Sequence, residues 1–402
     1  MKEKMQTITF WTVCIFLFCY FLRILNFPNE LTVVFGGILC LVLLAQQKII
    51  RIDLGICLLA IALASYYVII NGSAGMFYAI LYIPLVVYEL GNYMVRSSNG
   101  KENLNNKLLL LIFIMIVGYT IHGILNSYMW YAGYVVPGTR RWQDFWSGEI
   151  VPGTQHVAYF LPALAMFLPA VIYFKKRKVL NLLIIITSIF FIYTSLATRS
   201  RMSIVIFAIV LFAQIILYGL FERKNITKHL ANKRFWIIGI VGLAAVVIIG
   251  IAVKDSAVMS AFIANLGKDG GILNNVRFQA QKLAVQQLFV YPMGGYKMDL
   301  GLISNAHNTW LDMANAAGVI PFFAFAAYTV YTLYELARVL TNNEVQIESK
   351  LMLTGVYGAF FLYLAVEPAM EASIHLVTPW IFANGVIHGY WCDLIKKYKA
   401  EK

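Results

Sequence analysis

The stretch MSIVIFAIVLFAQIILYGL, residues 202–220, contains no charged side chain and decides the class of fold. An α-helix needs roughly 20 mostly apolar residues to cross the hydrocarbon core of a bilayer. Because no water is available there, a spanning segment must satisfy its own backbone hydrogen bonds, and a helix does so. The stretch therefore predicts a transmembrane helix.

Similar apolar stretches occupy most of the chain. Of its 402 residues, 60% are hydrophobic and only 13% are charged, whereas a soluble domain has about 25% charged residues. Mean hydropathy is +0.73. We expect an all-α, polytopic bundle with about twelve spans, forming a single transmembrane domain over residues 1–402. The expected spans are 7–26, 31–46, 52–70, 76–94, 107–126, 156–174, 179–197, 202–220, 236–253, 313–337, 351–368 and 374–395.

The basic residues alternate from one side of these spans to the other. Most of the 32 Lys and Arg residues fall on the same side as the N-terminus, including the run 175–178. The opposite loops near 27–30, 71–75 and 369–373 contain none. Because cytoplasmic loops carry an excess of Lys and Arg, we expect both termini in the cytoplasm. The formal net charge of +13 then needs no nucleic acid partner.

The N-terminus and the cysteines give simple expectations. A basic start precedes the first span, and no small-residue cleavage site follows it, so we expect an uncleaved anchor. The five cysteines lack metal-ligand spacing, and we expect them to be apolar packing residues within the spans. They are Cys14, Cys19, Cys40, Cys57 and Cys392.

Two long loops are expected on the extracytoplasmic side, at 127–155 and 254–312. The first is rich in Trp and Tyr, which favours either an interfacial aromatic belt or a rim that contacts sugars or lipids. In the second, apolar residues recur on one face of a predicted helix that Asn274 or Asn275 could cap and that ends before Pro292. Such a helix can lie on the membrane surface or cover the bundle. The apolar residues of this face are Val276, Ala280, Leu283, Ala284 and Leu288.

Several arginines stand on the side where basic residues are scarce. Arg199 and Arg201 lie in a tight link between two spans, and charge near the apolar core is costly. The planar guanidinium suits bidentate phosphate binding. The alternative is that these arginines snorkel to the interface or pair with acids. The other arginines of this group are Arg140, Arg141 and Arg277, and the candidate acids are Asp144, Glu149, Glu367 and Glu371.

One histidine differs from the others in its surroundings. His122 and His375 are expected to be satisfied interior histidines. His307 follows the predicted amphipathic helix and precedes a span, in the sequence NAHNTWL of residues 305–311. A histidine at the membrane edge can act as a general base near neutral pH.

The segment His307-Asn308-x-Trp310-Leu311, with Gly318 beyond it, resembles a motif of the bacterial O-antigen ligase and polymerase superfamily. Ser200-Arg201 at the start of a span is similar to another motif of that family, and the spacing of Arg141, Pro152 and Ala158 is a looser match. The order of Arg277, Pro292-x-Gly294-Gly295 and His307 also resembles the family pattern. The resemblance covers roughly residues 140–330. Trp310 stands where tyrosine is usual, and Pro321 follows Gly318 where a second glycine is usual, which leaves the subfamily open.

The resemblance implies a metal-independent, inverting glycosyltransferase in the bacterial cytoplasmic membrane, with no cofactor. Its donor would be a glycan linked to polyprenyl pyrophosphate, bound by Arg201 and Arg277 together with Arg199, Arg141 and Arg140. His307 would take the proton of the acceptor hydroxyl, and Asn308 would bind substrate and orient the site. The absence of an Asp-x-Asp cluster from the extracytoplasmic loops agrees with a metal-free reaction.

Three functions stay open at this level. A polysaccharide polymerase and a ligase that transfers a finished glycan to a lipid-linked acceptor share the donor chemistry. A flippase for lipid-linked oligosaccharides is the alternative from another class. The long loops follow the fifth and ninth expected spans rather than dividing the chain into two halves, which counts against a transporter of the major facilitator type. A chain-length regulator is a possible further partner.

Overall fold

The structure is a computed structural model that describes residues 2–24, 38, 52–96, 101–134, 141–174, 176–198, 200–222, 276–372 and 374–400. Seven of the described helices are long and apolar enough to cross a membrane, and Thr7–Leu22 and Leu54–Ile69 are shorter apolar helices. The chain is thus a helical membrane protein. The expected span 236–253, all of 31–46 except residue 38, and residues 254–275 of the long loop lie outside the described residues. The count of twelve spans stays a prediction.

The chain divides into two compact units. Unit 1 comprises residues 1–111, 273–346 and 360–402, and unit 2 comprises residues 112–272 and 347–359. The helices α6 (Lys101–Tyr131) and α18 (Ile347–Val366) contribute to both. Unit 1 also contains α1 (Lys2–Leu22), α3 (Leu54–Ile69), α4 (Ala74–Phe77), η2 (Tyr78–Tyr82), α5 (Ile83–Arg96), α15 (Val276–Gln287), α16 (Thr309–Ala317), α17 (Val319–Thr341), α19 (Ala369–Ala372) and α20 (Ile374–Ala400).

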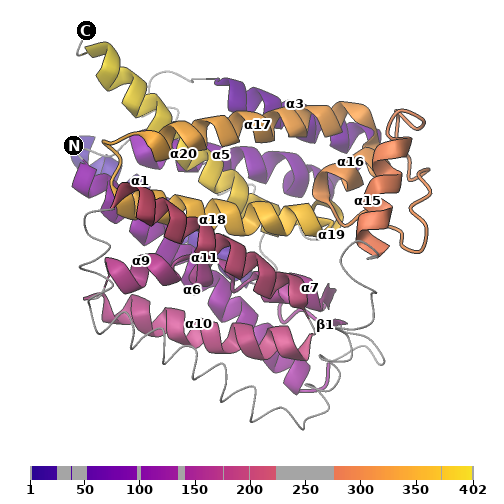
Figure 1. The fold of residues 1–402 in the computed structure, drawn as a ribbon, viewed down its shortest axis with the longest axis horizontal. Coiled ribbons are helices and arrows are strands. Elements are labelled where there is room, and N and C mark those ends of the chain that lie inside the picture. The colour runs from indigo at the N-terminus through magenta and orange to yellow at the C-terminus, as the bar shows by residue number, and fades with distance from the viewer. Residues whose placement is uncertain are drawn as a thin grey trace. The chain divides into compact units, whose positions relative to one another are not determined.

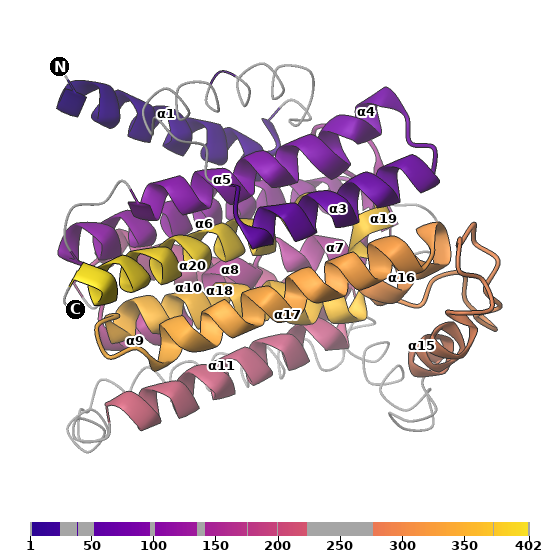
Figure 2. The ribbon, with the colours of Figure 1, turned by 90° about the horizontal axis from the view of Figure 1, so that it is seen from above.

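Glycines allow the helices of unit 1 to pack closely. α5 lies against α20, and α17 lies along α3 (Figure 2). A Cβ atom at Gly385 would stand 2.0 Å from the carbonyl oxygen of Tyr88, and one at Gly91 would stand 2.6 Å from that of Phe382. Small residues at such crossings let two backbones approach, which is how helices in membranes associate.

Charged side chains are buried within the same unit. His388 of α20 lies between two carboxylates, with Nδ1 2.8 Å from Glu335 Oε1 of α17 and Nε2 3.2 Å from Asp53 Oδ2. Asp53 also caps α3 by accepting a hydrogen bond from the backbone N–H of Ile56. Because an isolated buried charge is expensive, this mutual pairing fixes the positions of three helices.

The expected span 313–337 is two helices in the structure. α16 ends before Gly318, whose φ of +82° places it in the left-handed region, and α17 begins at Val319. Residues 313–317 therefore belong to a separate short helix, and the predicted start of this span was wrong. The break turns the chain between the loop that carries His307 and the long helix α17.

Unit 2 contains a span that is broken by prolines. Its elements are the strands β1 (Arg141–Gln143) and β2 (Ile150–Pro152), and the helices α7 (Gly153–Ala158), α8 (Leu161–Ala165), α9 (Phe167–Ile172), α10 (Lys178–Ala197) and α11 (Arg201–Phe221). Pro169 has no N–H to offer the carbonyl of Ala165, four residues earlier. Gln214 of α11 supplies the missing donor, with its Nε2 2.8 Å from Ala165 O. The expected span 156–174 is therefore helical in three pieces.

Candidate functional site

An acidic residue connects two of the side chains singled out in the sequence. Glu367 follows α18 and is buried, with 8% of its side chain exposed. Its Oε1 accepts a hydrogen bond of 2.9 Å from Nη1 of Arg277, on α15, and its Oε2 lies 3.6 Å from Nδ1 of His307. Nη1 of Arg277 also donates to the carbonyl of Val366, at 3.0 Å. The structure thus brings Arg277 and His307 together around one carboxylate.

The backbone around His307 is held in an uncommon conformation. His307 has a φ of +51°, in the left-handed region that few residues other than glycine adopt. The carboxylate of Asp312 accepts hydrogen bonds from the backbone N–H groups on either side, 2.6 Å from Ala306 and 2.9 Å from Asn308. Gln281 of α15 donates to the carbonyl of His307 at 3.3 Å. These contacts hold the backbone of His307 in place, and 24% of its side chain stays exposed.

Asn308 and Thr309 attach this loop to the end of α18. The Oδ1 of Asn308 caps α16 by accepting from the N–H of Leu311, and its Nδ2 donates 3.1 Å to the carbonyl of Ala365. The hydroxyl of Thr309 donates 2.9 Å to the carbonyl of Glu367. Asn308 was expected to orient the site, and these contacts give it the means to do so. Its amide is occupied by the protein.

The glycine-rich turn Pro292-x-Gly294-Gly295 packs directly against Gly318. The N–H of Gly295 donates to Ala316 at 2.9 Å, and the N–H of Val319 donates to Pro292 at 2.9 Å. A Cβ atom on Gly318 would lie 2.1 Å from the carbonyl oxygen of Pro292, and one on Gly294 would lie 2.5 Å from the nitrogen of Gly318. The turn at residues 292–295 and the motif that runs from His307 to Gly318 are therefore parts of one structure, and this structure determines where α17 begins.

Trp310 fixes α16 from its other side. Its indole N–H donates 2.9 Å to the hydroxyl of Thr329 on α17. Its ring contacts those of Phe325, Phe361 and Trp380 at centroid distances of 5.9, 5.6 and 6.3 Å. A rigid aromatic support of this kind restricts the motion of the residues that precede it.

The carboxylates of the site differ in their affinity for protons. Burial alone would raise the pKa of Glu367, but the neighbouring His307 and Arg277 outweigh it and lower that pKa below its usual range. Burial raises the pKa of Asp312 to about 6, despite its two backbone donors. Burial of the carboxyl also raises the pKa of Glu371 to about 7, although the residue as a whole is exposed. Tyr296, hydrogen-bonded to Glu371, has a pKa raised to about 12 by burial and by that acid.

The other predicted arginines belong to unit 2 or lie outside the described residues. Arg141 is exposed at the start of β1, and Arg201 is the first residue of α11. Arg140 and Arg199 lie outside the described residues. Arg277, His307 and Asn308 form one cluster in unit 1, and the roles expected for the other arginines stay predictions.

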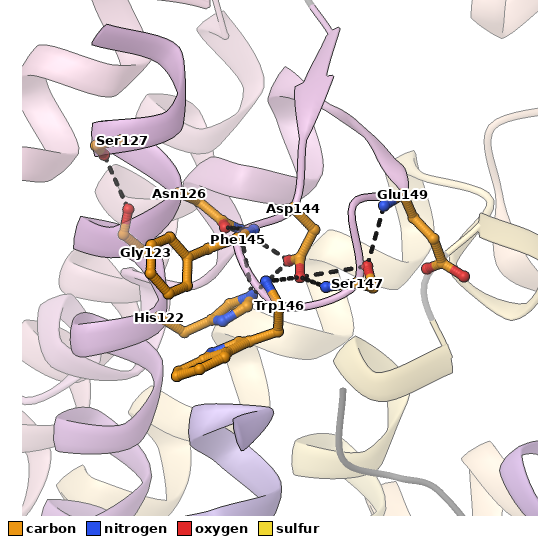
Figure 3. Close-up of polar contacts among 9 residues, drawn as sticks. All are labelled: His122, Gly123, Asn126, Ser127, Asp144, Phe145, Trp146, Ser147 and Glu149. Carbon is orange, nitrogen blue, oxygen red and sulfur yellow. Dashed lines mark hydrogen bonds and ion pairs between the residues drawn. The ribbon is translucent and has the colours of Figure 1, made fainter. Parts of the chain in front are cut away.

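The loop that carries Arg141 is fastened to α6 by a buried polar cluster (Figure 3). Asp144 Oδ2 lies 2.9 Å from Nε2 of His122 and accepts a hydrogen bond of 3.0 Å from Asn126. Its Oδ1 accepts from the backbone N–H groups of Trp146 and Ser147. His122 is fully buried, as expected for an interior histidine. The cluster fixes the six-residue connection between β1 and β2, residues 144–149, to the helix.

The aromatic residues of this first loop divide into two kinds. Trp142 is fully buried, with its ring 4.8 Å from Trp130 and 4.7 Å from His156, so it is a packing residue. Tyr131 and Tyr134 are exposed. Tyr128 is exposed as well, and these three tyrosines fit the belt or rim that the composition suggested better than Trp142 does.

Sequence reasoning did not name Asp312. It considered Glu367 and Glu371 only as acids that could neutralise an arginine. Glu367 does pair with an arginine, Arg277, through Oε1. Its other carboxylate oxygen, Oε2, also lies near His307. Within the described part of the chain, no group of three or more His, Cys, Asp or Glu side chains is placed to hold a metal ion.

Comparison with known proteins finds no matching family model and no matching curated protein.

Proposed function

We propose that this protein is a membrane glycosyltransferase that polymerises a surface polysaccharide from a glycan linked to polyprenyl pyrophosphate. The observation that carries the proposal is the placement of Glu367 between Arg277 and His307, 2.9 Å from the one and 3.6 Å from the other. A cation, a buried acid and an imidazole at the end of a spanning helix are the groups needed to transfer a sugar from an anionic leaving group. The motif resemblance of residues 140–330 supplies the substrate class.

In the proposed reaction, the hydroxyl oxygen of the acceptor attacks the anomeric carbon of the donor sugar. The bond from that carbon to the pyrophosphate oxygen breaks, and the polyprenyl pyrophosphate leaves with the electron pair. His307 takes the proton of the acceptor hydroxyl, and Glu367 stabilises the imidazolium that forms. Arg277 balances the charge that develops on the leaving group. Attack from the side opposite to the leaving group inverts the configuration at the anomeric carbon.

The proposed location is the extracytoplasmic face of the bacterial cytoplasmic membrane. Both chain termini would then be cytoplasmic, as the distribution of Lys and Arg favours. Arg201, Arg199, Arg141 and Arg140 are proposed as further contacts to the pyrophosphate or glycan.

The decisive experiment is a transfer assay with purified protein in lipid nanodiscs and a donor glycan on polyprenyl pyrophosphate. We expect new glycosidic bonds with the wild type and a loss of about 100-fold or more in His307→Ala and Arg277→Ala. Lys297→Ala is the matched control for Arg277→Ala, because it removes an exposed positive charge from the same loop and contacts neither Glu367 nor His307. Normal activity in both site variants would contradict the proposal.

The acceptor distinguishes the polymerase from a ligase. A polymerase extends a second lipid-linked glycan, whereas a ligase transfers the finished glycan to another lipid-linked acceptor. Supplying each acceptor separately to the same assay separates the two. Movement of the lipid-linked donor across the bilayer without any bond formation, unaffected by His307→Ala, would instead support a flippase.

A further inference from the structure

The loop helix α15 has a second apolar face, opposite to the one that the sequence pattern identified. Ala280, Ala284 and Leu288 are buried against the rest of unit 1. Phe278 and Val285 lie on another side of α15, and Phe289 lies in the turn that follows its last residue, Gln287; the three are 46%, 58% and 72% exposed. We call these three residues, with Lys282 between them, the outward face. An apolar surface that the described residues of unit 1 leave this exposed calls for a partner.

The outward face continues onto a surface that is itself expected to meet lipid. The ring of Phe289 lies 6.1 Å from that of Phe323, near the start of α17. Phe323 and its neighbour Ile320 are 49% and 53% exposed on a helix long and apolar enough to span the membrane. A side chain exposed on such a helix contacts acyl chains. Phe289, beside the first turns of α17, therefore lies at the edge of the surface that contacts lipid.

The direction of α15 fits a helix in the plane of a bilayer. α15 runs crosswise to α17, at the end where α17 begins (Figure 1). In Figure 2 it is seen nearly end-on while α17 lies across the view. If α17 spans the membrane, α15 lies along the membrane surface. That is the orientation in which an amphipathic helix buries one face between headgroups and acyl chains.

The charges of this segment match a phosphate headgroup layer. From Val276 to Met298 the sequence contains no Asp or Glu, and its charged residues are Arg277, Lys282 and Lys297. Lys282 lies among the apolar residues of the outward face, where its long stem can lie along lipid with the ammonium group at the phosphates. Basic residues near a bilayer surface are each attracted by about 1 kcal/mol when the lipids are anionic.

We propose that the outward face of α15 is a membrane-binding surface that rests in the boundary between headgroups and acyl chains, at the end of the bundle that carries His307. α15 then contacts two environments at once. Ala280 and Ala284 cover the bundle, and Phe278, Val285 and Phe289 enter the lipid. The alternatives left open by the sequence pattern, a surface helix or a cover for the bundle, describe two faces of one helix.

The test is photo-crosslinking of the full-length protein in nanodiscs of phosphatidylethanolamine and phosphatidylglycerol. The crosslinking amino acid p-benzoylphenylalanine replaces Phe289 in one variant, Val285 in a second and Gln286 in a third. Gln286 is the matched control, because it is exposed on the same helix but outside the outward face. After irradiation, mass spectrometry of the intact protein identifies lipid adducts. We expect several-fold more lipid adducts at positions 289 and 285 than at 286.

Three outcomes would overturn this proposal. They are equal adduct yields at all three positions, an absence of lipid adducts at 289 and 285, and crosslinks from these positions to another protein instead of lipid. All three replaced side chains are exposed, so the variants keep the packing of unit 1. The measurement uses no sugar donor, and its result is therefore independent of the proposed transferase activity.

Discussion

Among single residues, Glu367 makes the sharpest prediction about chemistry. Glu367→Gln keeps the size of the side chain and removes the charge that Arg277 and His307 share. We expect kcat to fall by about 100-fold, because the imidazolium formed on proton transfer loses its counter-charge. Initial rates in the transfer assay check this. Glu344→Gln, in an exposed turn, is the matched control, and equal rates in the two variants would remove Glu367 from the mechanism.

Glu371 makes a prediction about pH. Its pKa is raised to about 7, so the carboxyl is neutral below that pH and negative above it. A negative charge beside the site repels an anionic pyrophosphate. We therefore expect the KM for the donor to rise as pH increases through about 7, by up to about tenfold, the equivalent of one pKa unit. Glu371→Gln stays neutral and should show a flat profile over the same range. A wild-type rise that persists in the variant would assign it to another group.

The sequence could single out His307 and Arg277, but it named Glu367 only as one of four acids that could pair with an arginine. Each of the two residues can be recognised from its neighbours in the sequence. His307 lies in a motif, and Arg277 lies on a predicted amphipathic helix. Glu367 lies 90 positions beyond Arg277, and the two meet only through the packing of α15 on the end of α18. Asn308 is the converse case. Its place in a motif suggested contact with substrate, but its side chain caps α16 and binds the carbonyl of Ala365.

At the scale of elements, the contact between the Pro292 turn and Gly318 determines where α17 begins. Gly318→Ala would add a Cβ atom 2.1 Å from a backbone oxygen, in a residue whose φ of +82° disfavours any side chain. We expect a loss of unfolding free energy of about 2 kcal/mol or more. Differential scanning fluorimetry of the detergent-purified protein measures it as a lower Tm. In the control Gly75→Ala, the new methyl group meets no atom within 4 Å, and a similar Tm for both variants would refute the steric argument.

Elements were predictable where one physical signal dominated. Long apolar stretches such as 202–220 gave helices at the expected places, because hydropathy alone determines them. The break at Gly318 was missed because apolar residues continue on both sides of it. The three pieces of the span near 156–174 follow from Pro162 and Pro169, but their stabilisation depends on Gln214, a polar residue in a distant apolar helix. The hairpin of β1 and β2 had no clear alternating pattern in the sequence.

At the scale of the whole molecule, the charge distribution predicts which side of the membrane holds the site. Ser304 precedes α17, close in sequence to His307, and Asn343 follows α17; both are exposed. Because a spanning helix separates them, a thiol reagent that does not cross the membrane should reach only one in sealed cells. We expect Ser304→Cys to react in intact spheroplasts and Asn343→Cys to react only after lysis. The wild type is the background control, since its described cysteines lie in helices. Labelling in the opposite order would place His307 in the cytoplasm, and the proposed extracytoplasmic transfer would then be wrong even if the chemistry of Arg277, Glu367 and His307 were right.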